Sequence, residues 1–154
     1  MRIEAFLRES PLFAVTSTAR RFEALTARIL EDDDLSFLEA LVLAAIFFEA
    51  PRPVRPSSLA ETFGTTRGNV SHCLSSLEAK GMVQRKIDPE DARAYGLTLK
   101  LQGRKAAVRA IGAFDRLQRI FERGAGKSAL REMLETLRQI ETVFAGAVAA
   151  SRER

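Results

Sequence analysis

The chain is poor in the residues on which most catalytic and metal sites depend. It has one cysteine, Cys73, and one histidine, His72. A single cysteine excludes an intramolecular disulfide and a cysteine-rich zinc site, and a reducing compartment is the simplest fit. Hydrolase triads, metal-binding pairs and phosphate-binding loops are absent from the sequence as well. We therefore expect no enzyme, no cofactor and no bound metal.

Long apolar runs are also missing. The longest one, around Leu41 to Phe48, is far short of the ~20 residues that a membrane-spanning helix needs. The opening residues, Met1-Arg2-Ile3-Glu4, are not followed by the apolar segment of a secretory signal. These absences predict a cytoplasmic protein without a membrane partner.

The composition suits one packed domain with a mild positive charge. Of the 154 residues, 46% are hydrophobic and 29% are charged, and the formal net charge is +4. Such a chain fits one domain, or one domain with helical extensions. The small positive excess permits nucleic-acid binding without identifying it, so the placement of the charges matters more than their sum.

Amphipathic helices are predicted at both ends of the chain. Ser10-Pro11 is a helix start signal, Gly103 is expected to open a long helix, and Ser128 can cap the last helix after a break at 124–126. The apolar stripes of these helices are too wide for the small central module to cover. A two-fold homodimer is the favoured solution, and the alternative is a monomer in which they pack on their own module.

The middle of the fold is predicted to hold one apolar helix. The acidic cluster from Glu31 to Asp34 is interpreted as a solvated connector that favours the next helix N-terminus. Ser36 and Glu39 then match a capping box. The helix that they start, Phe37 to Phe48, is apolar on nearly every side, so we expect it to be buried.

Two short helices joined by a tight turn follow. The first can begin at a second capping box, Ser58 to Glu61, or with Pro56 at its first helical position. In the turn, Gly64 can adopt the left-handed conformation, and the hydroxyl of Thr66 can cap the second helix. Residues that share the predicted core face of the second helix are Val70, Leu74 and Leu77.

The opposite face of this second helix suits a groove lined with phosphates. It carries small hydrogen-bonding groups and no carboxylate before Glu78. Arg67 can form a bidentate contact with guanine or bind a phosphate, and Asn69 can pair with adenine. The alternative is an ordinary polar surface. The residues of the turn and helix that we predict to contact DNA are Thr65, Thr66, Arg67, Gly68, Asn69, Ser71, His72 and Ser75.

A two-stranded ribbon with a charged tip comes next. Residues 82–87 and 94–101 have strand character, and Asp88-Pro89 starts the turn between them. Arg93 is placed to enter a narrow minor groove, and Asp91 is expected to orient the wing by pairing with Arg93 or Arg85. The alternative is a solvated hairpin tip. The wing residues predicted to contact DNA are Arg85, Lys86 and Arg93.

These residues resemble the MarR (multiple-antibiotic-resistance) family of winged helix-turn-helix transcription regulators. The segments that carry the resemblance, between about Leu35 and Gly103, are Leu59-Ala60-Glu61, Val70-Ser71, the run from Leu77 to Arg85, and Asp88 to Arg93. The resemblance implies an obligate homodimer whose second helices enter the major grooves of a pseudo-palindromic operator. Arg93 would lie in or beside the minor groove. A small aromatic or phenolic effector, bound between the dimerisation and DNA-binding regions, would release the DNA.

The chain also departs from the family pattern. Ala92 stands where a second basic residue is common, Lys100 replaces a threonine, and Gly68 is unusual early in a recognition helix. Some family members sense oxidants through a cysteine near the first helix, where this chain has none. Cys73 lies beside the predicted core face, so we interpret it as a small core thiol, because a redox role needs a low thiol pKa and access.

The sequence thus predicts a mainly α fold with a small β wing: a winged helix-turn-helix with N- and C-terminal dimerisation helices. We expect a single domain, 1–154, with a DNA-binding region at 35–103 and dimerisation regions at 1–34 and 104–154. The predicted function is a homodimeric, sequence-specific DNA-binding regulator, a repressor released by a small molecule. The alternative function is a dimeric winged-helix protein-interaction module without operator binding.

Overall fold

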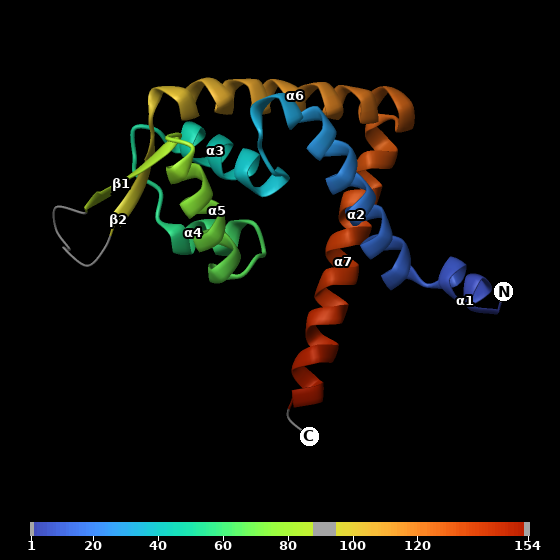
Figure 1. The fold of residues 1–154 in the computed structure, drawn as a ribbon. Coiled ribbons are helices and arrows are strands. Elements are labelled where there is room, and N and C mark those ends of the chain that lie inside the picture. The colour runs from blue at the N-terminus through green and yellow to red at the C-terminus, as the bar shows by residue number, and fades with distance from the viewer. Residues whose placement is uncertain (1, 88–94, 153–154) are drawn as a thin grey trace. The chain divides into compact units, whose positions relative to one another are not determined.

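The computed structural model describes residues 2–87 and 95–152 and divides the chain into two compact units, Met1–Ala113 and Phe114–Arg154 (Figure 1). The described elements are mainly helical, with one two-stranded antiparallel sheet, which confirms the predicted fold class. In chain order they are α1 (Arg2–Glu9), α2 (Pro11–Ile29), the 3-10 turn η1 (Glu31–Asp33), α3 (Phe37–Glu49), α4 (Pro56–Thr62), α5 (Arg67–Ala79), β1 (Val83–Ile87), β2 (Tyr95–Leu99), α6 (Leu101–Ala125) and α7 (Lys127–Arg152).

Helix α3 supplies much of the core of the first unit. Its residues Val42 and Leu43 are fully buried, as predicted, but Phe48 at its end is 68% exposed, so the expectation of burial on nearly every side is only partly correct. The predicted capping box is confirmed: the Ser36 N–H donates to Glu39 Oε2 (2.7 Å), and the Glu39 N–H donates to Ser36 Oγ (3.2 Å). These two hydrogen bonds satisfy amide groups that the first turn of a helix otherwise leaves without partners.

The helix-turn-helix forms as its start and turn signals predict. Of the two starts that the sequence left open for α4, the structure has the second: the helix begins with Pro56 at its first helical position, without a side-chain cap, and the Ser58 capping box does not form. Gly64 has a φ of 57°, in the left-handed region that favours glycine. Thr66 Oγ1 accepts the Asn69 N–H at 3.1 Å and caps α5. The predicted core face is confirmed, because Val70, Leu74 and Leu77 are all buried.

The wing strands pair antiparallel, with Val83 opposite Leu99 and Ile87 opposite Tyr95. Val54 bridges Leu97 at the root of the sheet. The second predicted strand was too long: the chain enters α6 at Leu101, whose side chain is exposed. The tip, 88–94, lies outside the described residues.

Small residues let the first turns of α6 lie against the core. Gly103 does not open the helix as predicted but lies in its first turn. A Cβ atom there would approach the Met82 carbonyl oxygen to 2.0 Å, so no side chain fits. Ala106, Ala107 and Ala110 continue the contact and are fully buried. The polypeptide backbones can therefore approach more closely than larger side chains would allow.

The acidic connector is tied to the core rather than only solvated, which corrects our interpretation. The Asp33 carboxylate accepts from Arg109 Nε of α6 at 2.8 Å and 3.0 Å. Asp34 adopts a left-handed conformation, with a φ of 51°, and its carbonyl oxygen accepts from Lys80. These partners are 76 and 46 residues away along the chain, so no local pattern indicates them.

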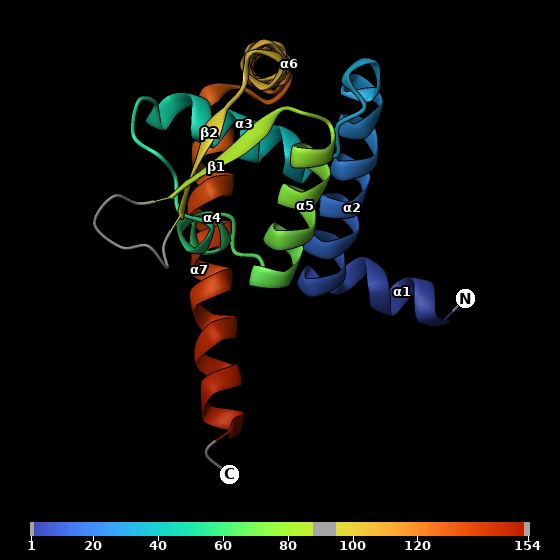
Figure 2. The same ribbon diagram turned by 60° about the vertical axis from the view of Figure 1, so that its left-hand side comes forward.

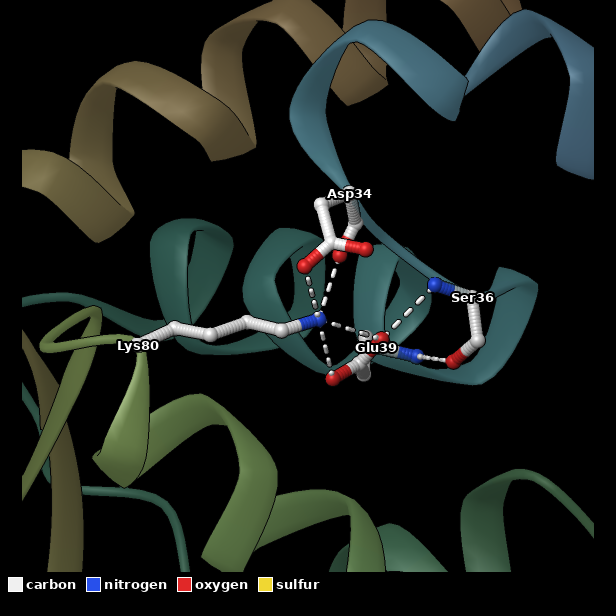
Figure 3. A network of polar contacts seen from close by, with 4 residues as sticks. All are labelled: Asp34, Ser36, Glu39 and Lys80. Atoms are coloured by element: carbon white, nitrogen blue, oxygen red, sulfur yellow. Dashed lines mark hydrogen bonds and ion pairs between the residues drawn. The ribbon is translucent and has the colours of Figure 1, made fainter.

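A polar network joins the end of α5 to the start of α3 (Figure 3). Lys80, the C-cap residue of α5, reaches between Asp34 and Glu39, and its Nζ lies 3.1 Å from Glu39 Oε1. Burial raises the pKa of Glu39, but hydrogen bonds from Ser36, Ser76 and Lys80 outweigh it and leave the pKa below its ordinary 4.5. The network therefore holds a charged carboxylate that is only 5% exposed.

The second unit consists of the end of α6 and helix α7. Gly126, with a φ of 83°, separates the two helices, and Gly124 remains within α6. Helix α7 begins at Lys127, so Ser128 is not its cap; its hydroxyl donates to Glu132 Oε1 instead. The large apolar residues that α7 leaves exposed are Met133, Leu134, Leu137, Ile140, Val143, Phe144 and Val148.

Within the part of the chain that the structure describes, none of the helices combines the length and apolar character that crossing a bilayer requires.

Replacing Glu39 should make the free energy of unfolding less dependent on pH. The pKa of Glu39 is lowered in the folded state, so its contribution is complete above its ordinary 4.5 and is lost as pH falls through the folded-state pKa. We expect Glu39→Gln to lower the free energy of unfolding at neutral pH by about 1–3 kcal/mol and to flatten its decline below about pH 4.5. Urea unfolding at a series of pH values measures both effects.

The matched control is Glu135→Gln, which removes a carboxylate from an exposed pair with Arg138. An exposed pair of this kind contributes about 0–1 kcal/mol. If the two variants lost equal stability and kept the same acid profile as the wild type, Glu39 would not stabilise the fold through its charge.

Candidate nucleic-acid interface

Helix α5 presents a continuous exposed face formed by residues that the sequence singled out. Arg67, Gly68, Ser71, His72 and Ser75 are exposed, as are Thr66 and Asn69, while Thr65 in the preceding turn is half-buried. The helix is anchored by its opposite face, where Leu77 is fully buried. The core thus determines which side of α5 faces outward.

The two edges of this face border different hollows. The wing-side hollow, of about 470 Å³, is lined by Pro56, Ser57, Arg67, Ser71, Leu74 and Tyr95. The α3-side hollow, of about 350 Å³, is lined by Ser36, Leu38, Glu39, Asn69, His72, Cys73 and Ser76. At 100° per residue, Gly68 and Ser75 lie between these edges. The predicted contact residues are therefore spread across the whole exposed arc of the helix.

Several polar groups at the start of α5 are used within the protein. Asn69 Nδ2 donates to Thr65 Oγ1 at 3.1 Å, and Thr66 Oγ1 accepts the Asn69 backbone N–H. Further along, Ser75 Oγ donates to the Ser71 carbonyl oxygen at 3.0 Å. These hydrogen bonds hold the polar side chains close to the helix surface.

The wing is linked to α5 by one bidentate ion pair. Arg85 Nε and Nη2 donate to the two carboxylate oxygens of Glu78 at 2.7 Å and 2.9 Å. The hydrogen bond with Glu78 is the main cause that raises the pKa of Arg85. Arg85 Cζ also lies 4.7 Å from the ring centroid of Tyr95. Glu78, the first carboxylate of α5, is therefore neutralised, and β1 is held beside the helix.

Part of the predicted wing site cannot be placed. Arg85 and Lys86 are exposed on β1, as expected. Arg93 and Asp91 lie outside the described residues, so the minor-groove contact and the orienting role stay predictions. For Arg85, the structure supplies a carboxylate partner in Glu78, where the sequence suggested Asp91.

Cys73 belongs to the buried side of α5. It is 6% exposed, and its pKa is raised to about 12, chiefly by burial and also by the nearby negative charge of Glu39. A thiol with this pKa stays protonated at neutral pH, whereas oxidant sensing needs a thiolate. The geometry agrees with the core-thiol interpretation. Among the described residues, no group of three or more His, Cys, Asp or Glu side chains is placed to hold a metal ion.

Sequence reasoning missed Lys80, Ser57 and Tyr95. Lys80 follows α5 directly, where a cation is favoured by the helix dipole, but nothing local points to Glu39. Ser57 and Tyr95 come from α4 and β2 and meet only at the wing-side hollow. Figure 2 shows these two elements converging beside α5.

Comparisons with known proteins agree with this geometry. Residues 33–94 match the sequence model of the MarR family. The S. aureus MepR–DNA complex is 16% identical with a TM-score of 0.79, covering 88% of this chain and 96% of that chain. The M. tuberculosis transcriptional regulator MOSR in complex with DNA is 22% identical (TM-score 0.71; coverage 88% and 98%). The transcriptional regulator BldR from Sulfolobus solfataricus is 23% identical (TM-score 0.72; coverage 92% and 98%).

Among curated protein sequences, none matches this chain. At the identities given above, the likeness to solved structures shows the fold, and the sequence similarity to the MarR family is limited to residues 33–94. Residues 33–94, which include the winged helix-turn-helix, are thus similar in sequence to the MarR family, and the chain has the fold of these solved structures.

Proposed function

We propose that this protein is a homodimeric regulator of transcription that binds duplex DNA at specific sites and acts as a repressor. The observation that carries the proposal is the exposed face of α5, which has no carboxylate before Glu78 and lies beside an arginine-bearing wing. A helix of this kind fits a major groove, and a wing fits the flanking backbone or minor groove. The solved DNA complexes of MepR and MOSR support the same use of this fold.

The proposed contacts fall into two groups. Side chains of the turn and of α5 enter the major groove, and the wing side chains contact the backbone and the minor groove. Asp91 is proposed to orient the wing. The residues proposed to contact DNA are Thr65, Thr66, Arg67, Gly68, Asn69, Ser71, His72, Ser75, Arg85, Lys86 and Arg93.

Dimerisation is proposed to bury the apolar faces of the terminal helices. Within the first unit, α2 exposes Leu12 (57%) and Leu25 (56%); within the second, α7 exposes Val143 (73%) and Phe144 (54%). Contiguous exposed apolar surface of this kind marks a protein interface. A second copy of the chain is the simplest partner, because a two-fold dimer also gives the paired helices that a pseudo-palindromic operator needs.

A third hollow supports control by a small molecule. It has a volume of about 680 Å³ and lies between α2, α3 and the turn of the helix-turn-helix. Phe37, Leu41 and Phe63 give it apolar walls, and Asn69 of α5 lines it as well. We propose that a small aromatic effector binds there and weakens DNA binding, because it would contact both a dimerisation helix and the recognition helix.

The competing function is a dimeric winged-helix module that binds protein and no operator. A gel-shift titration against random duplexes at graded salt separates the two functions. DNA binding should weaken steeply between about 50 and 200 mM salt, because counterions are released from the phosphates. Absent or salt-independent binding would favour the interaction module.

The wing contact is tested by Arg93→Ala. We expect affinity for a selected operator to fall by about 1–3 kcal/mol, since an arginine contact with DNA is lost. Arg138→Ala, which removes an exposed arginine from α7, is the matched control and should leave affinity unchanged. The dimer should persist in both variants by sedimentation. An unchanged affinity of the Arg93 variant would remove the wing from the mechanism.

The dimer is tested by placing charge on α7. Phe144→Glu should shift the protein towards monomer or aggregate in sedimentation, because a buried unpaired carboxylate costs several kcal/mol. Glu141→Gln, three residues earlier on the same helix, is the matched control. Deletion of 129–154 should abolish the dimer as well. A clean dimer after that deletion would show that α7 is not needed for association.

The effector site is tested by filling it. Millimolar 4-hydroxybenzoate should weaken operator binding by the wild type in fluorescence anisotropy. Ala24→Trp, which places a large ring in the same hollow, should bind operator yet lose the response to this ligand. A variant that still responds like the wild type would place the effector elsewhere.

A further inference from the structure

The wing-side hollow brings together three segments that the sequence keeps apart. Pro56 and Ser57 come from the first turn of α4, Arg67 and Ser71 from α5, and Tyr95 from the start of β2. Its floor is Leu74, which is 1% exposed. The hollow lies on the same side of α5 as the wing, so it faces the proposed DNA partner.

The lining has the chemistry of an anion site. Arg67 supplies a guanidinium, and Ser57, Ser71 and Tyr95 supply hydroxyl groups. The described residues that line it include no carboxylate. All four side chains can donate hydrogen bonds to phosphate oxygens. By contrast, the α3-side hollow on the opposite edge contains the carboxylate of Glu39. The linings of the two hollows therefore differ in charge.

The Tyr95 wall is held in position by the protein itself. Tyr95, Leu97 and Leu99 share one face of the sheet, and Leu97 is fully buried. The guanidinium of Arg85 stacks on the Tyr95 ring and is fixed in turn by Glu78. A wall with this support loses little conformational entropy when a ligand binds.

The position of Arg67 resolves a choice that the sequence leaves open. Arg67 and Ser71 lie on the edge of the exposed face, towards α4, while Gly68 and Ser75 occupy its centre. In a major groove, the centre of a recognition helix meets the base edges, and its flanks meet the groove walls, which are sugar and phosphate. The edge position therefore favours a backbone contact by Arg67 over a guanine contact.

We propose that the wing-side hollow seats one backbone phosphate of duplex DNA with its sugar, and that Ser57, Arg67, Ser71 and Tyr95 hold it. The proposal rests on the proposed function and adds Ser57 and Tyr95 to the contacts. Arg67 then positions the protein on the duplex and reads no base. The hollow ties the recognition helix and the wing to a single point on the DNA backbone.

Two neighbouring serines give a matched test. Ser57 lines the hollow, whereas Ser58, next to it in the first turn of α4, does not; both are exposed. Aspartate suits the first turn of a helix at either position. Ser57→Asp should lower operator affinity about tenfold or more beyond Ser58→Asp, because it sets a carboxylate against a phosphate. Circular dichroism and sedimentation should match the wild type in both variants.

A second measurement separates backbone contact from base reading. Arg67→Ala should weaken binding uniformly across single-base variants of a selected operator and reduce the salt slope by about 1. Tyr95→Phe, which removes only the hydroxyl, should weaken binding in the same sequence-independent way. Relaxed selection at one base pair in the Arg67 variant would show guanine reading and overturn the proposal, as would equal affinities of the two aspartate variants.

The same experiments distinguish this proposal from the proposed function. A wild-type protein that selects no duplex from a random pool would overturn both. The wild type could instead bind an operator with normal salt dependence while Ser57→Asp and Tyr95→Phe bind as tightly as the wild type. That result would overturn only the proposal that the wing-side hollow binds a phosphate.

Discussion

The buried carboxylate of Glu39 joins the start of α3 to the end of α5. It caps the start of α3 through Ser36, accepts from Ser76 of α5, and binds Lys80 at the end of α5. A buried charge is costly unless it is paired and hydrogen-bonded, so these partners cannot be removed one at a time without a large penalty. The recognition helix is therefore held at a defined orientation against the central helix.

The wing depends on the same helix from its other side. Glu78 leaves α5 one residue before its end and binds Arg85 of β1, and Arg85 stacks on Tyr95 of β2. Lys80 and Glu78, two residues apart at the end of α5, thus connect this helix with the core and with the wing. The surface that we propose to meet DNA is rigid at its root, and the wing-side hollow lies where helix and wing join.

The two C-terminal helices differ in how far they bury their side chains. The buried positions in the first turns of α6 are glycine and alanine, whereas α7 exposes large apolar side chains along its length. Burial of a large apolar side chain is worth roughly 1.5–3 kcal/mol, so a partner surface is favoured. The proposed dimer would supply that surface and would set the spacing of the two recognition helices.

The local elements of this protein were readable in the sequence because their signals are local. The Ser36 capping box, the Gly64 turn, the Thr66 cap and the apolar face of Val70, Leu74 and Leu77 each depend on residues within a few positions. The bounds of the second strand and of α6 were misplaced at Leu101 and Gly103, since the alternation of apolar residues does not show where a strand ends and a helix begins.

Only the tertiary structure decided which distant groups meet. Lys80 with Glu39, Arg109 with Asp33, and Ser57 with Tyr95 are brought together by helix packing and strand register, and no short-range pattern encodes those pairings. The sequence by itself determined the fold class, the resemblance of the winged helix to the MarR family and the outward face of α5. The partners that orient that face followed from the packing of the folded chain.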